Sequence, residues 1–221
     1  MGTRTIGFEL DHFFVAVSGP AVGATALRET GFLEGAPNTH TGQGTASRGV
    51  LFESVYLELI WLTDAEEAAS PTIRRTRLAD RVGPGAEACP FGLGLRGVGT
   101  ETPELPFPTW DYRPPYLPEG MSFQMGSSSE VLTEPLVFFL PWLSGPAWTP
   151  QEHPNGARRV TKITMILDQS ALNSPTVSAL SDAGIASFQE GNEYFMDVEL
   201  DGAGSGKGLD LRPDIPIRLR W

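Results

Sequence analysis

Three histidines are the side chains best suited to acid–base chemistry near neutral pH: His12, His40 and His153. Imidazole is also a common metal ligand, so each is a candidate catalytic residue. His12 lies inside an apolar run, whereas His40 and His153 lie in segments containing Gly or Pro that are typical of loops. For these two, ordinary loop polarity or a capping role is the alternative interpretation.

A carboxylate in a second apolar run is a natural partner for His12. In residues 55–62, Glu58 shares one face of the predicted strand with Tyr56 and Ile60. Burying an unpaired carboxylate costs on the order of several kcal/mol, which His12, a cation or a metal would offset. The alternative is that His12 is a hydrogen-bonded core residue and that Glu58 pairs with an arginine.

These residues belong to segments that predict a βαβββ unit over residues 8–62. Its first strand is predicted at 8–17, and a short helix then starts at Pro20 and ends at Gly31. Three more strands are predicted at 32–34, 48–53 and 55–62.

The C-terminal part, residues 158–221, predicts a second module of the same order. A strand at 160–167 precedes a helix with Ser174 at its N-cap and Gly184 at its end. Further strands are predicted at 193–200, 209–211 and 215–221. We therefore expect one domain, residues 1–221, that contains two related modules.

The middle region, residues 63–157, leaves two interpretations open. It predicts a helix at 64–82 and strands at 91–96, 121–125 and 136–140, while the Pro-rich stretch 103–118 excludes a regular helix or a central strand. The region is either an insertion or a helix-poor module that pairs with the first unit and leaves the C-terminal copy to pair elsewhere.

Composition narrows the classes of partner. The net charge of -11 disfavours nucleic acid, and the single cysteine, Cys89, excludes an intramolecular disulfide or a Cys-based zinc site. No apolar run approaches the roughly 20 residues of a membrane helix, and residues 1–6 show no export signal. We expect a soluble, cytoplasmic protein with a small-molecule partner, no membrane contact and a homodimer as the oligomeric alternative.

Six short motifs stand in a specific order along the chain. They are Leu10-Asp11-His12, Gly31-Phe32, His40-Thr41-Gly42-Gln43-Gly44-Thr45, Tyr56-Leu57-Glu58-Leu59-Ile60, Phe91-Gly92-Leu93-Gly94-Leu95-Arg96 and His153-Pro154-Asn155-Gly156-Ala157. In this combination the chain resembles the glyoxalase-like domain family of the vicinal-oxygen-chelate superfamily, which also includes bleomycin-resistance proteins and dioxygenases. The resemblance implies an α+β fold in which paired βαβββ modules form a curved, barrel-like mixed sheet around a cleft.

In metal-dependent members, each module commonly supplies a His and a Glu, which would be His12 and Glu58 in the first module here. Such ligands suit Mn, Fe, Co, Ni or Zn. By the repeat, Lys162 and Arg218 take the second pair of positions, and neither offers a lone pair. A divalent metal is therefore the candidate cofactor, with its second-module ligands missing, and we expect no tight binding through the four superfamily positions. Lys162 and Arg218 would instead hold an anionic substrate, or Arg218 would face solvent. The alternative is that the middle region pairs with the first module and that His40 or His153 completes the ligand set.

Aromatic side chains are further candidates for substrate contacts, with core packing as the alternative. The candidates are Tyr56, Trp61 and Trp142.

The resemblance favours an enzyme of the lyase or isomerase type, less so an oxygenase, acting on a carbonyl or enolisable substrate at His12 and Glu58. The alternatives are a metal-free enzyme that uses these residues as acid and base, and a metal-free protein that binds or sequesters a drug or metabolite.

Overall fold

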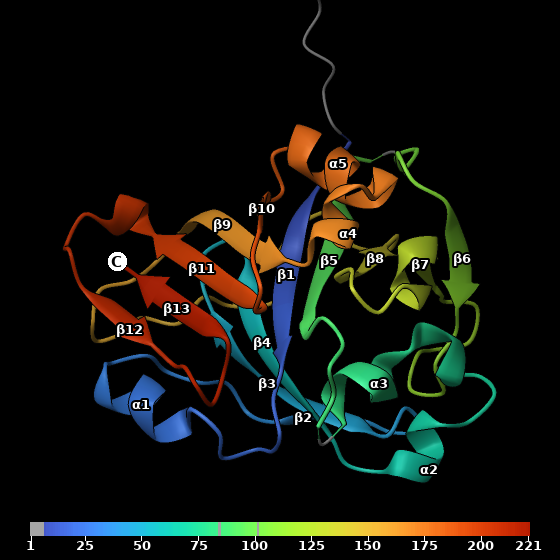
Figure 1. Ribbon diagram of the computed structural model, residues 1–221, viewed down its shortest axis with the longest axis horizontal. Coiled ribbons are helices and arrows are strands. Elements are labelled where there is room, and N and C mark those ends of the chain that lie inside the picture. The colour runs from blue at the N-terminus through green and yellow to red at the C-terminus, as the bar shows by residue number, and fades with distance from the viewer. Residues whose placement is uncertain (1–6, 84, 101) are drawn as a thin grey trace, which may run out of the picture.

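The computed structural model describes residues 7–83, 85–100 and 102–221 (Figure 1). The segment 1–6, to which the expectation about an export signal refers, lies outside the described residues. Within them, two sheets and several short helices form an α+β fold (Figure 1), which confirms the predicted class. None of these helices is long and apolar enough to cross a bilayer.

The first sheet has eight strands in the order β2-β3-β4-β1-β5-β8-β7-β6. The strands are β1 (Phe8–Ala16), β2 (Asn38–His40), β3 (Thr45–Leu51), β4 (Tyr56–Leu62), β5 (Phe91–Gly97), β6 (Thr109–Tyr112), β7 (Phe123–Gly126) and β8 (Leu136–Leu140). The helical elements along this part are α1 (Ala24–Glu29), α2 (Ala65–Ala68), η1 (Arg74–Thr76), α3 (Leu78–Val82) and η2 (Ser127–Glu130).

Counted outward from the centre of the sheet, the two halves have equivalent strand orders, β1-β4-β3-β2 and β5-β8-β7-β6. β1 pairs with β4 in parallel, β5 pairs with β8 in parallel, and β1 and β5 join the halves as antiparallel neighbours. Helix α1 connects β1 to β2, whereas the described residues between β5 and β6 contain no helix. The middle region is thus the helix-poor module that pairs with the first unit, and its Pro-rich stretch contributes only the edge strand β6.

The C-terminal segment forms a separate five-stranded sheet in the order β10-β9-β11-β13-β12. Its elements are β9 (Val160–Leu167), α4 (Gln169–Leu172), α5 (Pro175–Asp182), β10 (Ser187–Glu190), β11 (Phe195–Leu200), η3 (Asp201–Ala203), β12 (Gly208–Asp210) and β13 (Ile217–Arg220). In the first unit, β1 lies beside the last strand, β4. In the C-terminal segment, β9 instead lies between β10 and β11, away from the last strand, β13. The prediction that residues 158–221 repeat the βαβββ module is therefore wrong in topology, although their helix and three predicted strands are present.

Local signals predicted both ends of α5 and the end of α1, but α1 begins at Ala24 rather than at the predicted Pro20, which lies in a turn. Helix α5 begins where the Ser174 hydroxyl accepts hydrogen bonds from two N–H groups of the first turn, with Pro175 in that turn. Gly31 and Gly184 follow α1 and α5 with φ of 80° and 69°, the left-handed conformation predicted for both.

Two element predictions were wrong. The continuous helix predicted at 64–82 is divided into α2, η1 and α3, because Pro71 interrupts it and Arg77 takes a left-handed φ of 56°. The strand predicted at 32–34 is absent from the described ladders, and β2 takes its place. Phe32 packs instead against Phe52 and the C-terminal Trp221.

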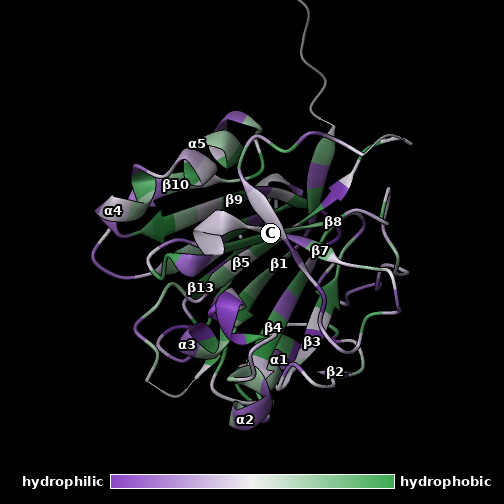
Figure 2. Ribbon diagram, turned by 90° about the vertical axis from the view of Figure 1, so that its right-hand side faces the viewer, coloured by the Kyte–Doolittle hydropathy of each residue, from purple (hydrophilic) through white to green (hydrophobic). Residues whose placement is uncertain are grey.

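Alternation along the strands divides the first sheet into two faces. From β1 and β4, side chains such as Phe13, Val15 and Leu57 join one apolar cluster with Met165 and Leu219 of the second sheet. The strands whose side chains pack between the two sheets accordingly carry long hydrophobic stretches (Figure 2). The other face of the first sheet is left for a cavity.

Candidate functional site

A cavity of about 180 Å³ lies on the face of the first sheet opposite the second sheet. Its lining divides into a polar group and an apolar group. The polar group is His12, Asn38, His40, Gln43, Tyr56, Glu58, Thr76, Tyr112 and Tyr116, and the apolar group is Phe14, Ile60, Leu78, Phe123, Met125, Leu136, Phe138 and Leu140. Both halves of the sheet therefore contribute to one site.

His12 is oriented by the residue next to it. A register shift between Leu10 and His12 interrupts the regular alternation of β1, and His12 Nδ1 lies 2.7 Å from a carboxylate oxygen of Asp11. Burial would raise the pKa of Asp11, but its hydrogen bonds with His12 and Arg96 hold that pKa below its ordinary value. An ionised Asp11 accepts the Nδ1 proton, so the lone pair of His12 is on Nε2.

Glu58 lies between the two cavity histidines. Its carboxylate oxygens are 3.8 Å from Nε2 of His12 and 3.9 Å from Nε2 of His40. The predicted approach of His12 and Glu58 on the inner face of a curved mixed sheet is confirmed, since both side chains are buried and line the same cavity. Both imidazole nitrogens stand beyond direct hydrogen-bond distance from the carboxylate, so the Nε2 atoms of His12 and His40 and the Glu58 oxygens are not paired with one another.

A hydrogen-bond chain sets the proton of His40. The Tyr112 hydroxyl donates to Gln43 Oε1 at 2.7 Å, and Gln43 Nε2 donates to the Thr45 hydroxyl at 2.8 Å. Thr45 is then free to donate to His40 Nδ1 at 2.9 Å. Burial first, and then the proximity of His12, lower the pKa of His40, against the opposing charge of Glu58. A neutral His40 with an acceptor at Nδ1 carries its proton on Nε2, facing Glu58.

Three tyrosines supply hydroxyl donors around this group. Burial raises the pKa values of Tyr56, Tyr112 and Tyr116, and Glu58 raises those of Tyr56 and Tyr116 further. All three therefore stay protonated at neutral pH. The Tyr56 ring also stacks on His12 at a centroid distance of 4.6 Å, which fixes the plane of the imidazole.

Three other predicted site residues lie away from the cavity lining. His153 is buried against Phe32 and Phe52 and accepts a backbone hydrogen bond at Nδ1. Trp61 belongs to the apolar cluster between the sheets. Trp142 contacts the cavity only through Phe123, at a centroid distance of 5.1 Å. Of the three histidines, the structure brings together His12 and His40.

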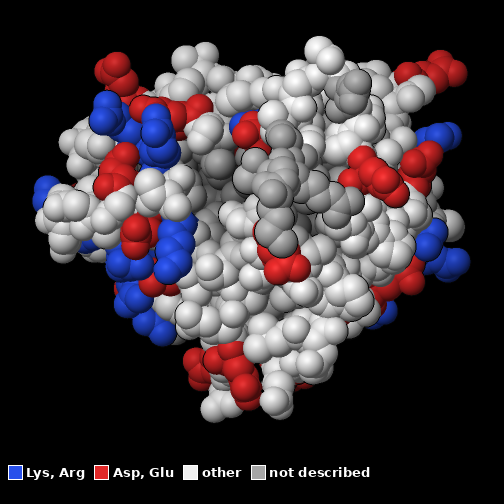
Figure 3. Space-filling view, turned by 90° about the horizontal axis from the view of Figure 1, so that it is seen from above, with Lys and Arg blue, Asp and Glu red and all other residues white. Residues whose placement is uncertain are grey.

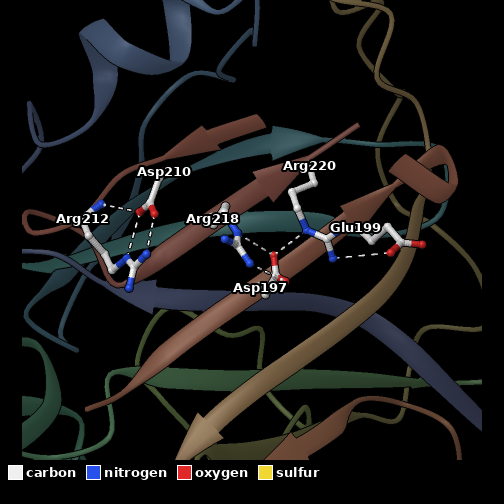
Figure 4. Close-up of polar contacts among 6 residues, drawn as sticks. All are labelled: Asp197, Glu199, Asp210, Arg212, Arg218 and Arg220. Carbon is white, nitrogen blue, oxygen red and sulfur yellow. Dashed lines mark hydrogen bonds and ion pairs between the residues drawn. The ribbon is translucent and has the colours of Figure 1, made fainter. Parts of the chain in front are cut away.

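Lys162 and Arg218 belong to the second sheet and are not part of the cavity lining. Lys162 is exposed on β9, and Arg218 forms an ion pair with Asp197 at 3.0 Å, beside Arg220 (Figure 4). Acidic and basic side chains are interleaved on that side of the molecule (Figure 3). The interpretation that these two cations join His12 and Glu58 in one anion-binding site is wrong, and the alternative of a solvent face for Arg218 agrees with the structure.

The donor set departs from the four-ligand metal pattern for a different reason than predicted. On the cavity side of β5 and β8, the second half presents Gly92, Gly94, Leu136, Phe138 and Leu140, none of which is a metal ligand. Across the described parts of the chain, no three His, Cys, Asp or Glu side chains are arranged around a common point that would hold an ion. These residues do not fit the superfamily metal, and we derive no step through it.

Sequence reasoning assigned no role to Asp11, Gln43, Tyr112 or Tyr116. Asp11 carried a usable signal, because an acid inside an otherwise apolar strand needs a partner. The tyrosines carried none, since they come from a Pro-rich stretch whose place in the sheet depends on distant pairing.

Comparisons with known proteins agree with this architecture. Residues 10–94 match the family model described as a glyoxalase-like domain. A crystal structure of a hypothetical protein from Staphylococcus aureus is 10% identical, covers 96% of this chain and 99% of its own, and superposes with a TM-score of 0.55. Methylmalonyl-CoA epimerase from Mycobacterium tuberculosis is 15% identical, with 67% of this chain and 94% of that chain covered and a TM-score of 0.39.

A mutant 4-hydroxymandelate synthase from Streptomyces coelicolor is 13% identical, with 97% of this chain and 62% of that chain covered and a TM-score of 0.40. No curated protein matches the chain. The match over residues 10–94 and the paired halves of the first sheet agree with the predicted resemblance to glyoxalase-like domains and with the vicinal-oxygen-chelate fold.

Proposed function

We propose that the chain is an enzyme of the lyase or isomerase type that moves a proton on an enolisable carbonyl substrate bound in the cavity. The observation that carries this proposal is the row Asp11–His12–Glu58–His40 at the polar end of an otherwise apolar cavity. A general base that can also return the proton and a neutral N–H donor are the groups that such a reaction requires.

Each group has a separate role in the proposal. The His12 Nε2 lone pair or the Glu58 carboxylate removes the proton beside the carbonyl, and the same group, now protonated, returns it to the neighbouring atom of the enolate. The Nε2 proton of His40 stabilises the oxygen on which negative charge develops. Asp11 keeps His12 in the tautomer with a free Nε2, and the apolar lining excludes water.

Solvent hydrogen exchange tests this without knowledge of the natural substrate. The protein is incubated in deuterated water with a panel of small ketones and aldehydes, and loss of the α-proton signal is followed by NMR. His12→Ala and Glu58→Gln are expected to lower the exchange rate by about 10² or more. His153→Gln is the matched control, because His153 lies outside the cavity. Exchange that is equal in all four proteins would refute the proposal. Parallel runs with a chelator and with Mn²⁺, Ni²⁺ or Zn²⁺ show whether a metal contributes.

A metal-free binding protein is the second candidate. The observation that favours it is the apolar surface that β7 and β8 bring to the cavity, which can hold a ligand but offers no acid or base. Tight binding of a molecule without any exchange or conversion would support this candidate over the enzyme.

A further inference from the structure

The cavity lining is uneven in charge. Glu58 is its one carboxylate, and among the described residues no Lys or Arg lines the cavity. The buried guanidinium of Arg96, which pairs with Asp11 behind His12, is occupied by Asp11, Glu9 and the backbone carbonyl of Ser54. An anionic ligand would therefore face Glu58 with no cation in the lining to offset the repulsion.

The size and shape of the cavity limit the ligand further. An apolar cavity of roughly 150 Å³ is known to hold benzene, so the 180 Å³ found here admits one ring with a small substituent. Aromatic groups surround it, with Phe138 edge-on to His12 at 5.3 Å and to Phe123 at 5.5 Å. Such edges and faces favour a flat ring.

The polar end favours a ligand hydroxyl, because a hydroxyl can donate to Glu58 and can also accept from the His40 Nε2 proton or a tyrosine hydroxyl. Glu58 offers only acceptor oxygens, and His12 offers the lone pair of Nε2, because its Nδ1 is used by Asp11. A ligand hydroxyl satisfies these acceptors, whereas an aprotic or anionic group leaves them unpaired.

We infer that this site is selective for an uncharged molecule about the size of one aromatic ring, with a hydroxyl group directed at Glu58 and its ring against Phe138 and Leu140. The inference rests on the proposed function and deepens it: the enolisable carbonyl substrate would be uncharged and would carry this hydroxyl beside its carbonyl. The selectivity depends on the cavity and its charge, not on the proton-transfer step.

Three fluorinated probes test the inference by ¹⁹F NMR titration at about pH 7. They are 4-fluorophenol, which is neutral at this pH, 4-fluorobenzoate, which is anionic, and 4-fluorotoluene, which lacks the hydroxyl. We expect the phenol to bind about tenfold more tightly than the toluene and at least about 10²-fold more tightly than the benzoate. Nuclear Overhauser contacts from the bound ring to the Leu136 and Leu140 methyl groups locate the probe.

Two variants show whether the preference for phenol over benzoate depends on the charge of Glu58 or follows from the loss of any buried carboxylate. Glu58→Gln is expected to raise benzoate affinity by about tenfold or more, because the repulsion is removed. Glu134→Gln is the matched control: Glu134 is also a buried carboxylate, but it hydrogen-bonds Ser174 outside the cavity. In this control we expect the ratio of phenol affinity to benzoate affinity to equal that of the wild type.

The inference is overturned if benzoate binds the wild type as tightly as the phenol, if Glu58→Gln leaves the ratio unchanged, or if the probes bind elsewhere or not at all. A failure of the exchange assay with selective phenol binding would refute the proton-transfer step alone. Exchange activity on anionic substrates without phenol selectivity would refute the present inference alone.

Discussion

Gly94 provides a direct test of the site geometry, because it lies in register with His12 across β1 and β5. A Cβ atom at Gly94 would stand 2.7 Å from His12 Nδ1 and 2.8 Å from Nε2, whereas ordinary contact begins at 3.4 Å. Because Cε1 of the ring lies closer still, the ring must retreat by about 1 Å in Gly94→Ala. It is held on its other side by Tyr56 and at Nδ1 by Asp11.

The expected cost has a structural and a functional part. Overpacking destabilises a core by about 1–3 kcal/mol, and a catalytic group displaced by about 1 Å loses on the order of 10²-fold in rate. Gly97→Ala is the control, since its Cβ would meet nothing closer than 3.4 Å. Any general effect of Gly→Ala on the unfolded chain is shared by both variants.

Urea unfolding measures the free energy of unfolding of each variant, and ¹⁵N NMR reports the protonation of the His12 ring nitrogens. We expect Gly94→Ala to be less stable than Gly97→Ala by the amount above and to shift the His12 signals. Equal stability, together with unchanged His12 signals, would show that the ring is not confined as the structure has it.

Three further predictions concern the supports of the site and of the fold. Arg81→Met should lose about 3 kcal/mol or more of unfolding free energy, because the buried Arg81 guanidinium donates to four backbone carbonyls. The control Arg77→Met, at an exposed arginine, should change the unfolding free energy by less than about 0.5 kcal/mol. Similar urea midpoints for the two variants would contradict this prediction. Asp11→Asn should cost roughly 3–5 kcal/mol by the same measurement, since it removes a buried partner of Arg96, and a near-neutral change would argue against the pair. Burial lowers the pKa of His153 below its ordinary 6.5. The stability that neutral His153 contributes is therefore present above that pH and is lost as the pH falls below it. His153→Gln should show a shallower decline of thermal stability in acid than the wild type, and an unchanged pH profile would exclude this role.

The sequence was informative where structure is local. Period-two alternation predicted that Glu58 shares a face with Tyr56 and Ile60, and all three line the cavity. Proline and glycine signals predicted both ends of α5 and the end of α1, because capping and a left-handed φ depend on a few adjacent residues.

The sequence was uninformative where structure depends on which strands pair. The C-terminal strands were recognised from their composition, but their order in the sheet was not, because β9 chooses its neighbours through contacts distant in sequence. That one error placed Lys162 and Arg218 in the site. His40 and His153 looked alike in sequence, and only the docking of their loops separates a cavity histidine from a packed one.

The unequal halves of the first sheet have a chemical consequence. In the superfamily pattern both modules bring ligands to the cleft, so a substrate can be polarised from two sides. Here the first half supplies His12, His40 and Glu58, while β5 and β8 supply glycine and apolar surface. A ligand must then bind end-on, with its polar group toward the first half and its ring toward the second. Because His12, Glu58 and His40 lie at that one end, only the atoms nearest the ligand's polar group are within reach of these three side chains, and the apolar surface of β8 determines which molecules bring a suitable bond there.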